Sequence, residues 1–356
     1  MGLQSITLYN FRSYNEESFE FSDGVNIIIG PNAAGKTNLL EAVYVSYLGK
    51  GFRSKQDSNL ISNGKTWAKI DSILDEQERS VVLEKPSPEV RLKKKFIFGG
   101  NEKLRLGFND LRPLVLFQPD DLRLIGSSPG RRRDYIDDFL SQLIPTYRQD
   151  LSAYNRVLLQ RNSYLKNLRG NANDQMFVWN MQLAERGGRI IQRRMKLLNM
   201  LSNKISDVYS QVAGASHKLK ITYESSVNLD NYSNSLLQTL EKSLPLDRLR
   251  GYTSAGVHRD NIAVSIDGKD FKDVASRGEN RTLILALKII ELEELEEARQ
   301  TSPLLLLDDV FSELDGSRRS LLTKYLEDHQ TLITTTDADI TQKRFSNTTN
   351  TISIAN

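Results

Sequence analysis

Two segments far apart in the chain carry residues whose types and spacing suit phosphate chemistry, GPNAAGKT at 30–37 and LLLLDD at 304–309. The first matches the pattern GxxxxGK(S/T). In this pattern glycines let backbone N–H groups surround a phosphate, the lysine reaches the β- and γ-phosphates, and the final hydroxyl ligates magnesium. The predicted nucleotide-binding residues here are Gly30, Pro31, Asn32, Ala33, Ala34, Gly35, Lys36, Thr37 and Asn38. A tight strand-to-helix turn without a ligand is the alternative interpretation.

The flanking sequence favours the phosphate loop over a plain turn. The preceding run VNIII at 25–29 is a short apolar strand, and the following residues 37–48 place Leu39, Leu40, Val43 and Tyr47 at helical spacing. The positive end of the predicted helix dipole would then face the bound anion.

The second segment predicts a buried strand that ends in two carboxylates. Four leucines suit a strand covered on both faces, and the carboxyl ends of such strands form the ligand-binding edge of open α/β sheets. Asp308 would hold the magnesium ion together with Thr37, and Asp309 would orient or deprotonate a water beside the γ-phosphate. Lys36 and Asp309 are therefore the predicted catalytic residues. Taken alone, the segment is equally consistent with a strand and an ordinary Asp-Asp turn.

Composition narrows the class of protein. The 356 residues contain no cysteine, which excludes disulfides and thiolate metal sites and fits a reducing compartment. No apolar run approaches the roughly 20 residues that span a bilayer, so we expect a cytoplasmic protein without a membrane segment. The net charge of +3 permits nucleic-acid binding but does not by itself indicate it.

The order of elements predicts an α/β fold with a helical insertion. The first hundred residues are strand-rich and suggest mixed sheets, whereas 129–250 has helical periodicity and strand character returns after Gly251. We expect one nucleotide-binding domain from 1–116 and 251–356, and a helical lobe from 117–250. A long helix is predicted from Gln175 to Val212; Gly187 and Gly188 inside it predict either a kink or a close helix crossing.

The residues before and after the second segment indicate the class of ATPase. SRGEN at 276–280 opens a strongly helical run, and a Ser followed by Gly at a helix start offers a hydroxyl and N–H groups to a phosphate. SELD at 312–315 follows the acidic pair, and TLITTTD at 331–337 predicts another strand with a polar end. This order matches a signature motif, Walker B segment, D-loop and switch strand.

On these motifs the chain resembles the RecF family, bacterial recombination mediators among the SMC and Rad50-type ABC ATPases. The resemblance covers nearly the whole chain. It is carried by NFRSY at 10–14, GFRS at 51–54, FQPDDLRLI at 117–125, PGRRRDYID at 129–137, LLQRNSYLK at 158–166, VWNMQLAERG at 178–187 and GVHRDN at 256–261, together with the segments above.

The resemblance implies a P-loop ABC-type ATPase head with mixed sheets and an inserted helical domain. It places Arg12 near the nucleotide, and Ser276 and Gly278 against the γ-phosphate held by a second subunit, with Asp315 at the same interface. It implies ATP and Mg²⁺ as cofactors and an ATP-dependent homodimer that closes as a clamp on duplex DNA near single-strand gaps. RecR as partner, RecA loading, and a weak, DNA-stimulated ATPase that resets the clamp are implied in the same way.

Three features depart from the broader ABC pattern. Glu279 replaces a frequent glutamine, and Thr336 with Asp337 stand where transport ATPases carry a switch histidine. Gln118 is a candidate Q-loop residue whose register is uncertain, because Pro119 follows it. For His258 we favour a structural hydrogen bond at a strand end over a functional role.

Basic clusters offer contacts to DNA phosphates but no readout of base sequence, and a solvated helix or strand face explains any single cluster at least as well. They are Arg91 with Lys93–Lys95, Arg131–Arg133, and Arg193 and Arg194 with Lys196. For Arg131–Arg133, coupling to the nucleotide site or packing also competes with DNA contact. No individual DNA-contacting residue is predicted from these clusters.

Other machines built on this type of ATPase fit the sequence less well. A transporter motor lacks its switch histidine here, and the two ATP-site segments lie much further apart than a minimal nucleotide fold needs. A Rad50-like nuclease partner needs long heptad arms and a cysteine hook, and the chain has no cysteine. A nucleotide-binding module without hydrolysis remains an alternative that phosphate release from the purified protein would distinguish.

Overall fold

The computed structural model describes residues 2–54, 56–86, 93–167, 173–311, 314–336 and 349–354. The chain forms two compact units, Met1–Asp121 with Glu291–Asn356 and Leu122–Ile290. The helices predicted for the insertion lie in the second unit, which also includes residues 251–290. The boundaries 117 and 250 stay a prediction about domains.

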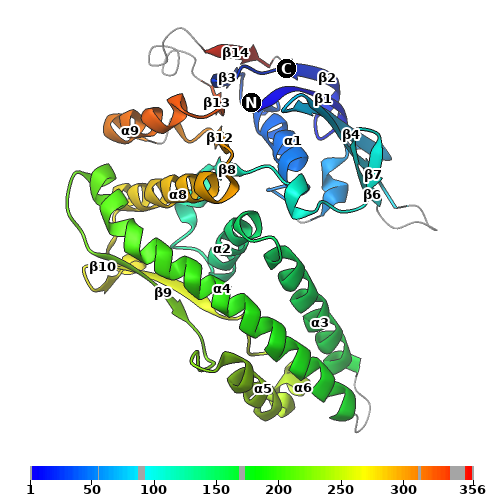
Figure 1. Ribbon diagram of the computed structural model, residues 1–356, viewed down its shortest axis with the longest axis vertical. Coiled ribbons are helices and arrows are strands. Elements are labelled where there is room, and N and C mark those ends of the chain that lie inside the picture. The colour runs from blue at the N-terminus through cyan, green and yellow to red at the C-terminus, as the bar shows by residue number, and fades with distance from the viewer. Residues whose placement is uncertain are drawn as a thin grey trace. The chain divides into compact units, whose positions relative to one another are not determined.

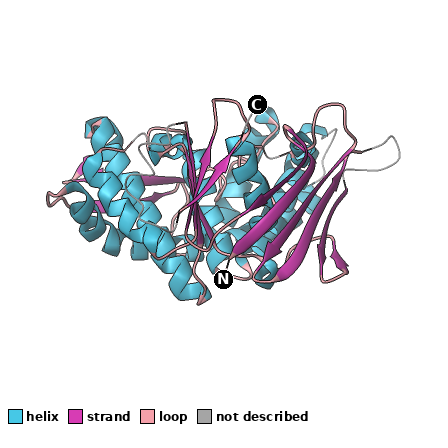
Figure 2. Ribbon diagram, turned by 90° about the horizontal axis from the view of Figure 1, so that it is seen from above, coloured by secondary structure: helices cyan, strands magenta, loops and turns pink. Residues whose placement is uncertain are grey.

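An antiparallel sheet of six strands forms one part of the first unit, in the order β2-β1-β4-β5-β6-β7 (Figure 1, Figure 2). Its strands are β1 Leu3–Phe11, β2 Tyr14–Glu20, β4 Trp67–Leu74, β5 Gln77–Glu84, β6 Lys93–Phe98 and β7 Asn101–Lys103. Two-residue turns connect β1 to β2, β4 to β5 and β6 to β7.

A parallel sheet of five strands carries the two motifs that opened the sequence argument. Its order is β14-β3-β13-β12-β8, from β3 Val25–Ile29, β8 Leu114–Phe117, β12 Leu304–Asp308, β13 Thr331–Thr335 and β14 Asn350–Ser353. All five residues of β12 are buried, as expected for a parallel strand covered on both faces. The predicted apolar strands at 25–29 and 304–308 are therefore present and lie in one sheet.

Helix α1, Lys36–Leu48, packs against strands of both sheets. Leu39, Leu40 and Val43 are fully buried, and the polar Glu41 is buried among them. A helix covered on nearly every side has little freedom to shift, which fixes the loop that precedes it. Helix α9, Gly316–Glu327, follows β12 and the residues after it.

The second unit is mainly helical. Its helices are α2 Pro129–Leu143, α3 Tyr147–Asn167, α4 Asn173–Ala213, α5 Tyr232–Lys242, α6 Leu244–Arg250 and α7 Phe271–Val274, with α8 Arg277–Arg299 starting in this unit. A three-stranded antiparallel sheet, in the order β11-β10-β9, adds β9 Leu219–Glu224, β10 Asn261–Ile266 and β11 Lys269–Asp270.

The paired glycines of α4 mark a close helix crossing. Helix α4 is continuous from Asn173 to Ala213, and α5 packs on it (Figure 1). A Cβ atom on Gly187 would lie 3.1 Å from Leu236 Cδ2, and one on Gly188 would lie 2.1 Å from Ser233 Oγ. Glycine is thus the residue that lets the two helices approach.

Within the described ranges, no helix is both long and apolar enough to cross a membrane. The same residues contain no cluster of three or more His, Asp or Glu side chains arranged to hold a metal ion.

Candidate nucleotide site

Four strands of the parallel sheet end at a common edge, and each is followed by a segment of the candidate site. Strand β3 is followed by the phosphate loop at 30–35, β12 ends at Asp308, and β13 is followed by Thr336. Phe117 of β8 pairs with Leu307 of β12, so the residues that follow them, Gln118 and Asp308, are in register at this edge. The fold therefore gathers residues from both ends of the chain at the place where parallel sheets bind ligands.

The phosphate loop has the backbone conformation and close approaches that its glycines allow. Gly35 has φ 107°, in the left-handed region, and α1 begins immediately after it. A Cβ on Gly30 would lie 2.6 Å from the carbonyl oxygen of Ile354, just beyond β14. Neither position accepts a larger side chain without movement of the neighbouring backbone or ring, so the loop has one tightly defined shape.

The side chain of Lys36 folds back onto the loop that precedes it. Its Nζ donates hydrogen bonds to the carbonyl oxygens of Gly30, at 2.7 Å, and Pro31, at 3.0 Å. No acidic residue lies in the first turn of α1, so nothing there competes with an anion for the positive end of the helix. The Lys36 ammonium group is thus held inside the loop, as the predicted phosphate-binding role requires.

Thr37 and Asp308, 271 positions apart in sequence, are in direct contact. The Thr37 hydroxyl donates to Asp308 Oδ1 at 2.9 Å. A hydroxyl and a carboxylate are the hard oxygen ligands that Mg²⁺ prefers, so these two residues fit the predicted metal site. Burial raises the pKa of Asp308, while hydrogen bonds from Thr334 and Thr37 and the charge of Arg53 act in the opposite direction.

Asp309 has φ 54°, in the left-handed region that side chains other than glycine rarely adopt. Its backbone N–H donates to the hydroxyl oxygen of Thr334, at 2.9 Å, and the same hydroxyl donates to Asp308 Oδ1. Thr334 therefore fixes the turn at which the two carboxylates separate.

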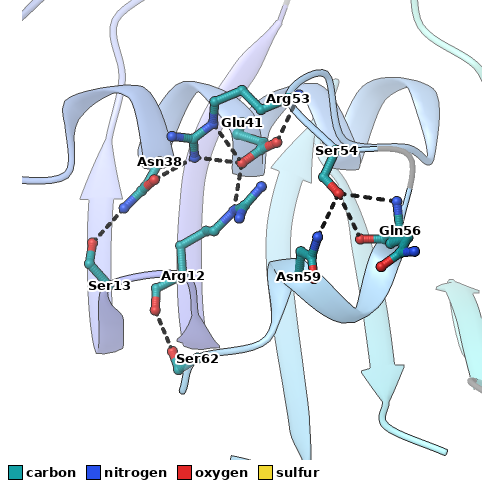
Figure 3. A network of polar contacts seen from close by, with 9 residues as sticks. All are labelled: Arg12, Ser13, Asn38, Glu41, Arg53, Ser54, Gln56, Asn59 and Ser62. Atoms are coloured by element: carbon teal, nitrogen blue, oxygen red, sulfur yellow. Dashed lines mark hydrogen bonds and ion pairs between the residues drawn. The ribbon is translucent and has the colours of Figure 1, made fainter.

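The turn between β1 and β2 packs against the phosphate loop. Tyr14 donates its hydroxyl to the Gly35 carbonyl at 3.1 Å, and Asn38 donates its side-chain amide to Ser13 Oγ at 2.7 Å. Arg12 lies in this turn and donates its Nε to Glu41 on α1, at 2.8 Å (Figure 3). The predicted position of Arg12, near the nucleotide site, is consistent with these contacts; its role stays a prediction.

Ser276 and Gly278 belong to the second unit, at the beginning of α8. The backbone N–H of Ser276 donates to Glu279 Oε2 at 2.7 Å, and the backbone N–H of Glu279 donates to Ser276 Oγ at 3.2 Å. This reciprocal pair is a capping box, which gives a physical reason for Glu279 at a position where many ABC proteins have glutamine. Ser276 is exposed.

The other predicted motifs have simpler local roles. Asp315 caps α9 by accepting the backbone N–H of Arg318, at 3.0 Å. Gln118 donates its backbone N–H to Asp121 Oδ2 at 3.0 Å, which closes the short turn after β8. Ser312, Glu313 and Asp337 lie outside the described residues.

Several residues of the basic clusters are packed within the second unit. Arg194 is 1% exposed and donates to both carboxylate oxygens of Asp137, at 3.0 and 2.9 Å. Arg132 donates to the Asn261 side chain and Arg133 to the Asp260 carbonyl. For these arginines the structure favours packing over DNA contact. Arg91 lies outside the described residues.

His258 makes the structural hydrogen bonds expected of it. Its Nδ1 lies 2.7 Å from the Tyr154 hydroxyl, and its Nε2 lies 3.2 Å from the carbonyl oxygen of Thr253. Since a carbonyl can only accept, Nε2 carries the hydrogen and Nδ1 accepts from tyrosine. Burial lowers the pKa of His258 to about 4, so the ring is neutral at neutral pH.

Three residues of the site were not predicted from the sequence, namely Glu41, Arg53 and Thr334. Glu41 is four positions after Thr37, so it lies on the same helix face, and an acid within an otherwise apolar helix is a usable signal. Arg53 lies in the GFRS segment, but its pairing with Glu41 depends on the fold. Thr334 is one of three consecutive threonines, which the sequence does not distinguish.

Comparisons with known proteins agree with this architecture. Residues 2–355 match the family model described as RecF/RecN/SMC N terminal domain. The DNA replication and repair protein RecF of Agathobacter rectalis is 36% identical over 341 residues, covering 95% of this chain and 93% of the relative. The RecF of Clostridium acetobutylicum is 34% identical over 366 residues, covering 100% of this chain and 98% of the relative.

A solved structure described as the recombination mediator protein RecF-ATP in the RecFOR pathway is similar throughout. It superposes with a TM-score of 0.85 at 34% identity, covering 94% of this chain and 92% of the solved one. A second, described as RecF-ATPrS, gives 0.84, also at 34% identity, and covers 95% of this chain and 93% of the solved one. The predicted fold class, a P-loop ABC-type ATPase head with mixed sheets and an inserted helical domain, is confirmed, and the chain belongs to the RecF family.

Proposed function

We propose that this protein is an ATP-dependent recombination mediator that binds and hydrolyses ATP at the phosphate loop. The observation that carries the proposal is the contact between Thr37 and Asp308, which joins the two segments of one nucleotide site at 2.9 Å. The ATP and ATPrS in the descriptions of the two similar RecF structures support the same ligand.

Each predicted residue has a distinct role in this proposal. The backbone N–H groups of the loop at 30–37, all but Pro31, which has none, and the Lys36 ammonium would bind the phosphates, because the loop holds these donors in place before a ligand binds. Thr37 and Asp308 would hold Mg²⁺, which neutralises charge on the phosphate oxygens when bound. Asp309 accepts a hydrogen bond from the attacking water and orients it. An aspartate is one methylene shorter than the glutamate of many ABC proteins, and we expect slow hydrolysis as a result.

A second copy of the chain completes the site in this proposal. Ser276 and Gly278 stand at the exposed start of α8, a helix of 23 residues whose N–H groups and dipole favour an anion. They would bind the γ-phosphate held by the partner's phosphate loop. ATP would then stabilise the homodimer, and hydrolysis would release it.

The biological outcome follows from the family. We propose that the ATP-bound dimer is a clamp on duplex DNA near single-strand gaps, that RecR is its partner, and that RecA loading is the result. The naming of relatives as DNA replication and repair proteins, and of a similar structure as a mediator of the RecFOR pathway, supports this assignment. ATP hydrolysis would be weak and stimulated by DNA.

Sedimentation with ATP and a gapped duplex tests the proposal. Wild type should dimerise with ATP, Lys36→Ala should bind no ATP and stay monomeric, and Ser276→Arg should bind ATP without dimerising. Ser152→Arg, the same change at an exposed serine of α3, is the control and should behave as wild type. A wild-type monomer at saturating ATP would contradict the clamp, and normal dimerisation of Ser276→Arg would contradict the role of α8.

A further inference from the structure

Glu41 is a fully buried carboxylate that two arginines share. Its side chain is 0% exposed, and it lies one helical turn after Thr37. It accepts Arg12 Nε at 2.8 Å and Arg53 Nη2 at 2.6 Å, as well as Arg53 Nε at 3.1 Å and the Arg53 backbone N–H at 3.2 Å (Figure 3). Burying an ionised carboxylate without partners is costly, so this position needs the cations around it.

The electrostatics of the cluster favour the ionised acid. Burial alone raises the pKa of Glu41, but hydrogen bonds and charges from Arg12 and Arg53 outweigh it and leave the pKa below its usual value. One carboxylate with two guanidinium groups gives the cluster a net positive charge. Neither arginine is fully covered, because the Arg12 side chain is 20% exposed and that of Arg53 is 36% exposed.

Arg12 is placed against the phosphate loop by its own turn. Two hydrogen bonds join the neighbours of Arg12, Ser13 and Tyr14, to Asn38 and Gly35. Arg12 itself has φ 51°, and its backbone carbonyl accepts the hydroxyl of Ser62 at 2.8 Å. The strained backbone of Arg12 is thus held at both its side chain and its main chain.

Arg53 is placed by the loop that follows α1. A Cβ on Gly51 would lie 3.0 Å from Glu41 Oε1, so the glycine leaves room for the carboxylate to reach the backbone N–H of Arg53. Arg53 Nη2 also donates to Asn38 Oδ1 at 2.5 Å. Arg53 is thereby bound to two residues of α1, Asn38 and Glu41, within the first two turns after the phosphate loop.

We propose that Glu41 is a positioning residue that holds Arg12 and Arg53 together at the phosphate end of α1, so that both guanidinium groups act on one bound nucleoside triphosphate. This inference rests on the proposed ATP site. Arginine suits the task because its planar fork donates to the carboxylate on one side and keeps further donors for phosphate oxygens. The contributions of the two arginines to ATP affinity are then coupled through a residue that touches no ligand.

A double-mutant cycle tests the coupling. ATP dissociation constants are measured for wild type, Glu41→Gln, the Arg12→Ala/Arg53→Ala pair, and the triple variant. We expect Glu41→Gln to weaken ATP binding by about tenfold in the wild-type background and by less than about twofold without the arginines. The control is Glu102→Gln, the same change at an exposed ion pair with Lys95 in the same unit, which should leave ATP affinity unchanged.

The outcomes separate this inference from the function on which it rests. Absence of ATP binding by the wild type overturns the proposed function, and this inference with it. Two outcomes overturn the inference alone while the wild type still binds ATP. In the first, Glu41→Gln binds ATP as tightly as wild type. In the second, Glu41→Gln weakens ATP binding by the same factor with and without the two arginines. If Glu41→Gln does not fold, Arg12→Lys/Arg53→Lys gives a second test, because lysine keeps the charge but loses the fork. Unchanged ATP affinity in that folded variant would also overturn the inference.

Discussion

Thr334 of β13 donates its hydroxyl to the Asp308 carboxylate, at 2.9 Å, across the interface between neighbouring parallel strands. The same oxygen accepts the backbone N–H of Asp309, so one hydroxyl holds both aspartates of the candidate site. This arrangement explains why the acidic pair has a fixed shape even though Asp309 leaves the strand with a left-handed backbone.

Thr334→Val should reduce hydrolysis more than ATP binding. Valine has a similar shape but leaves the Asp308 carboxylate and the Asp309 N–H without this partner, which costs about 1–3 kcal/mol of stability. We expect phosphate release to fall about tenfold at saturating ATP, because the orientation of the acidic turn is lost. Thr334→Ser keeps the hydroxyl and is the control. Equal turnover by the valine variant and wild type would show that the bridge is dispensable.

Asp309→Asn should bind ATP and remain dimeric. Asparagine keeps the size of the side chain but removes the negative charge to which we assign the orientation of the attacking water, so we expect single-turnover phosphate release to fall by about 10² or more. Sedimentation with ATP should show a persistent dimer. Rapid hydrolysis by this variant would exclude Asp309 as the catalytic residue and direct attention to another base at the same edge.

Arg194→Gln should destabilise the protein without a specific effect on DNA binding. It leaves the Asp137 carboxylate buried without its cation, and breaking such a pair costs about 3–5 kcal/mol. Lys196→Gln removes a charge from the same cluster at an exposed position and should change stability by no more than about 0.5 kcal/mol. Chemical denaturation compares the two. DNA titration of folded Arg194→Gln should match wild type; a selective loss of DNA affinity would restore a surface role for Arg194.

His258 should contribute to acid lability. Its pKa is lowered from 6.5 to about 4, so the unfolded chain binds a proton between these values that the folded chain does not. The stability associated with the neutral ring is therefore fully present above about pH 6.5 and is lost as the pH falls towards 4. Between pH 7.5 and 5 we expect a loss of about 2 kcal/mol. Denaturant unfolding at both pH values measures this loss in the free energy of unfolding, and His258→Gln should not show it. An identical pH dependence of stability in wild type and His258→Gln would contradict the contribution of His258.

Local patterns predicted the nucleotide loop because a phosphate loop, its strand and its helix are continuous in sequence. They also identified the buried strand that ends at Asp308. Local patterns could not predict the contacts that complete the site, because Arg12, Glu41 and Arg53 meet only after the β1–β2 turn and the loop after α1 have packed.

For basic residues too, the sequence pattern does not reveal whether the side chain is buried or exposed. Arg194 and Lys196 carry equal charge and lie two positions apart, yet one is buried against Asp137 and the other is exposed. Charge alone cannot separate these cases, because the helix face that turns inward is decided by tertiary packing. For the same reason, the sequence alone did not decide whether Gly187 and Gly188 mark a kink or a close helix crossing. The position of α5 decides in favour of the crossing.

The strand order of the parallel sheet has a consequence for the way the protein is made. Strand β3 leads into the phosphate loop, and its two neighbours, β13 and β14, are synthesised some three hundred residues later. The six-stranded antiparallel sheet, built mostly from sequential hairpins, can form while the ribosome is still at work. The two strands that flank β3 are therefore available for pairing only after residues 331–353 have been synthesised. Until then the segment that leads into the loop at 30–35 lacks both of its neighbours in the sheet.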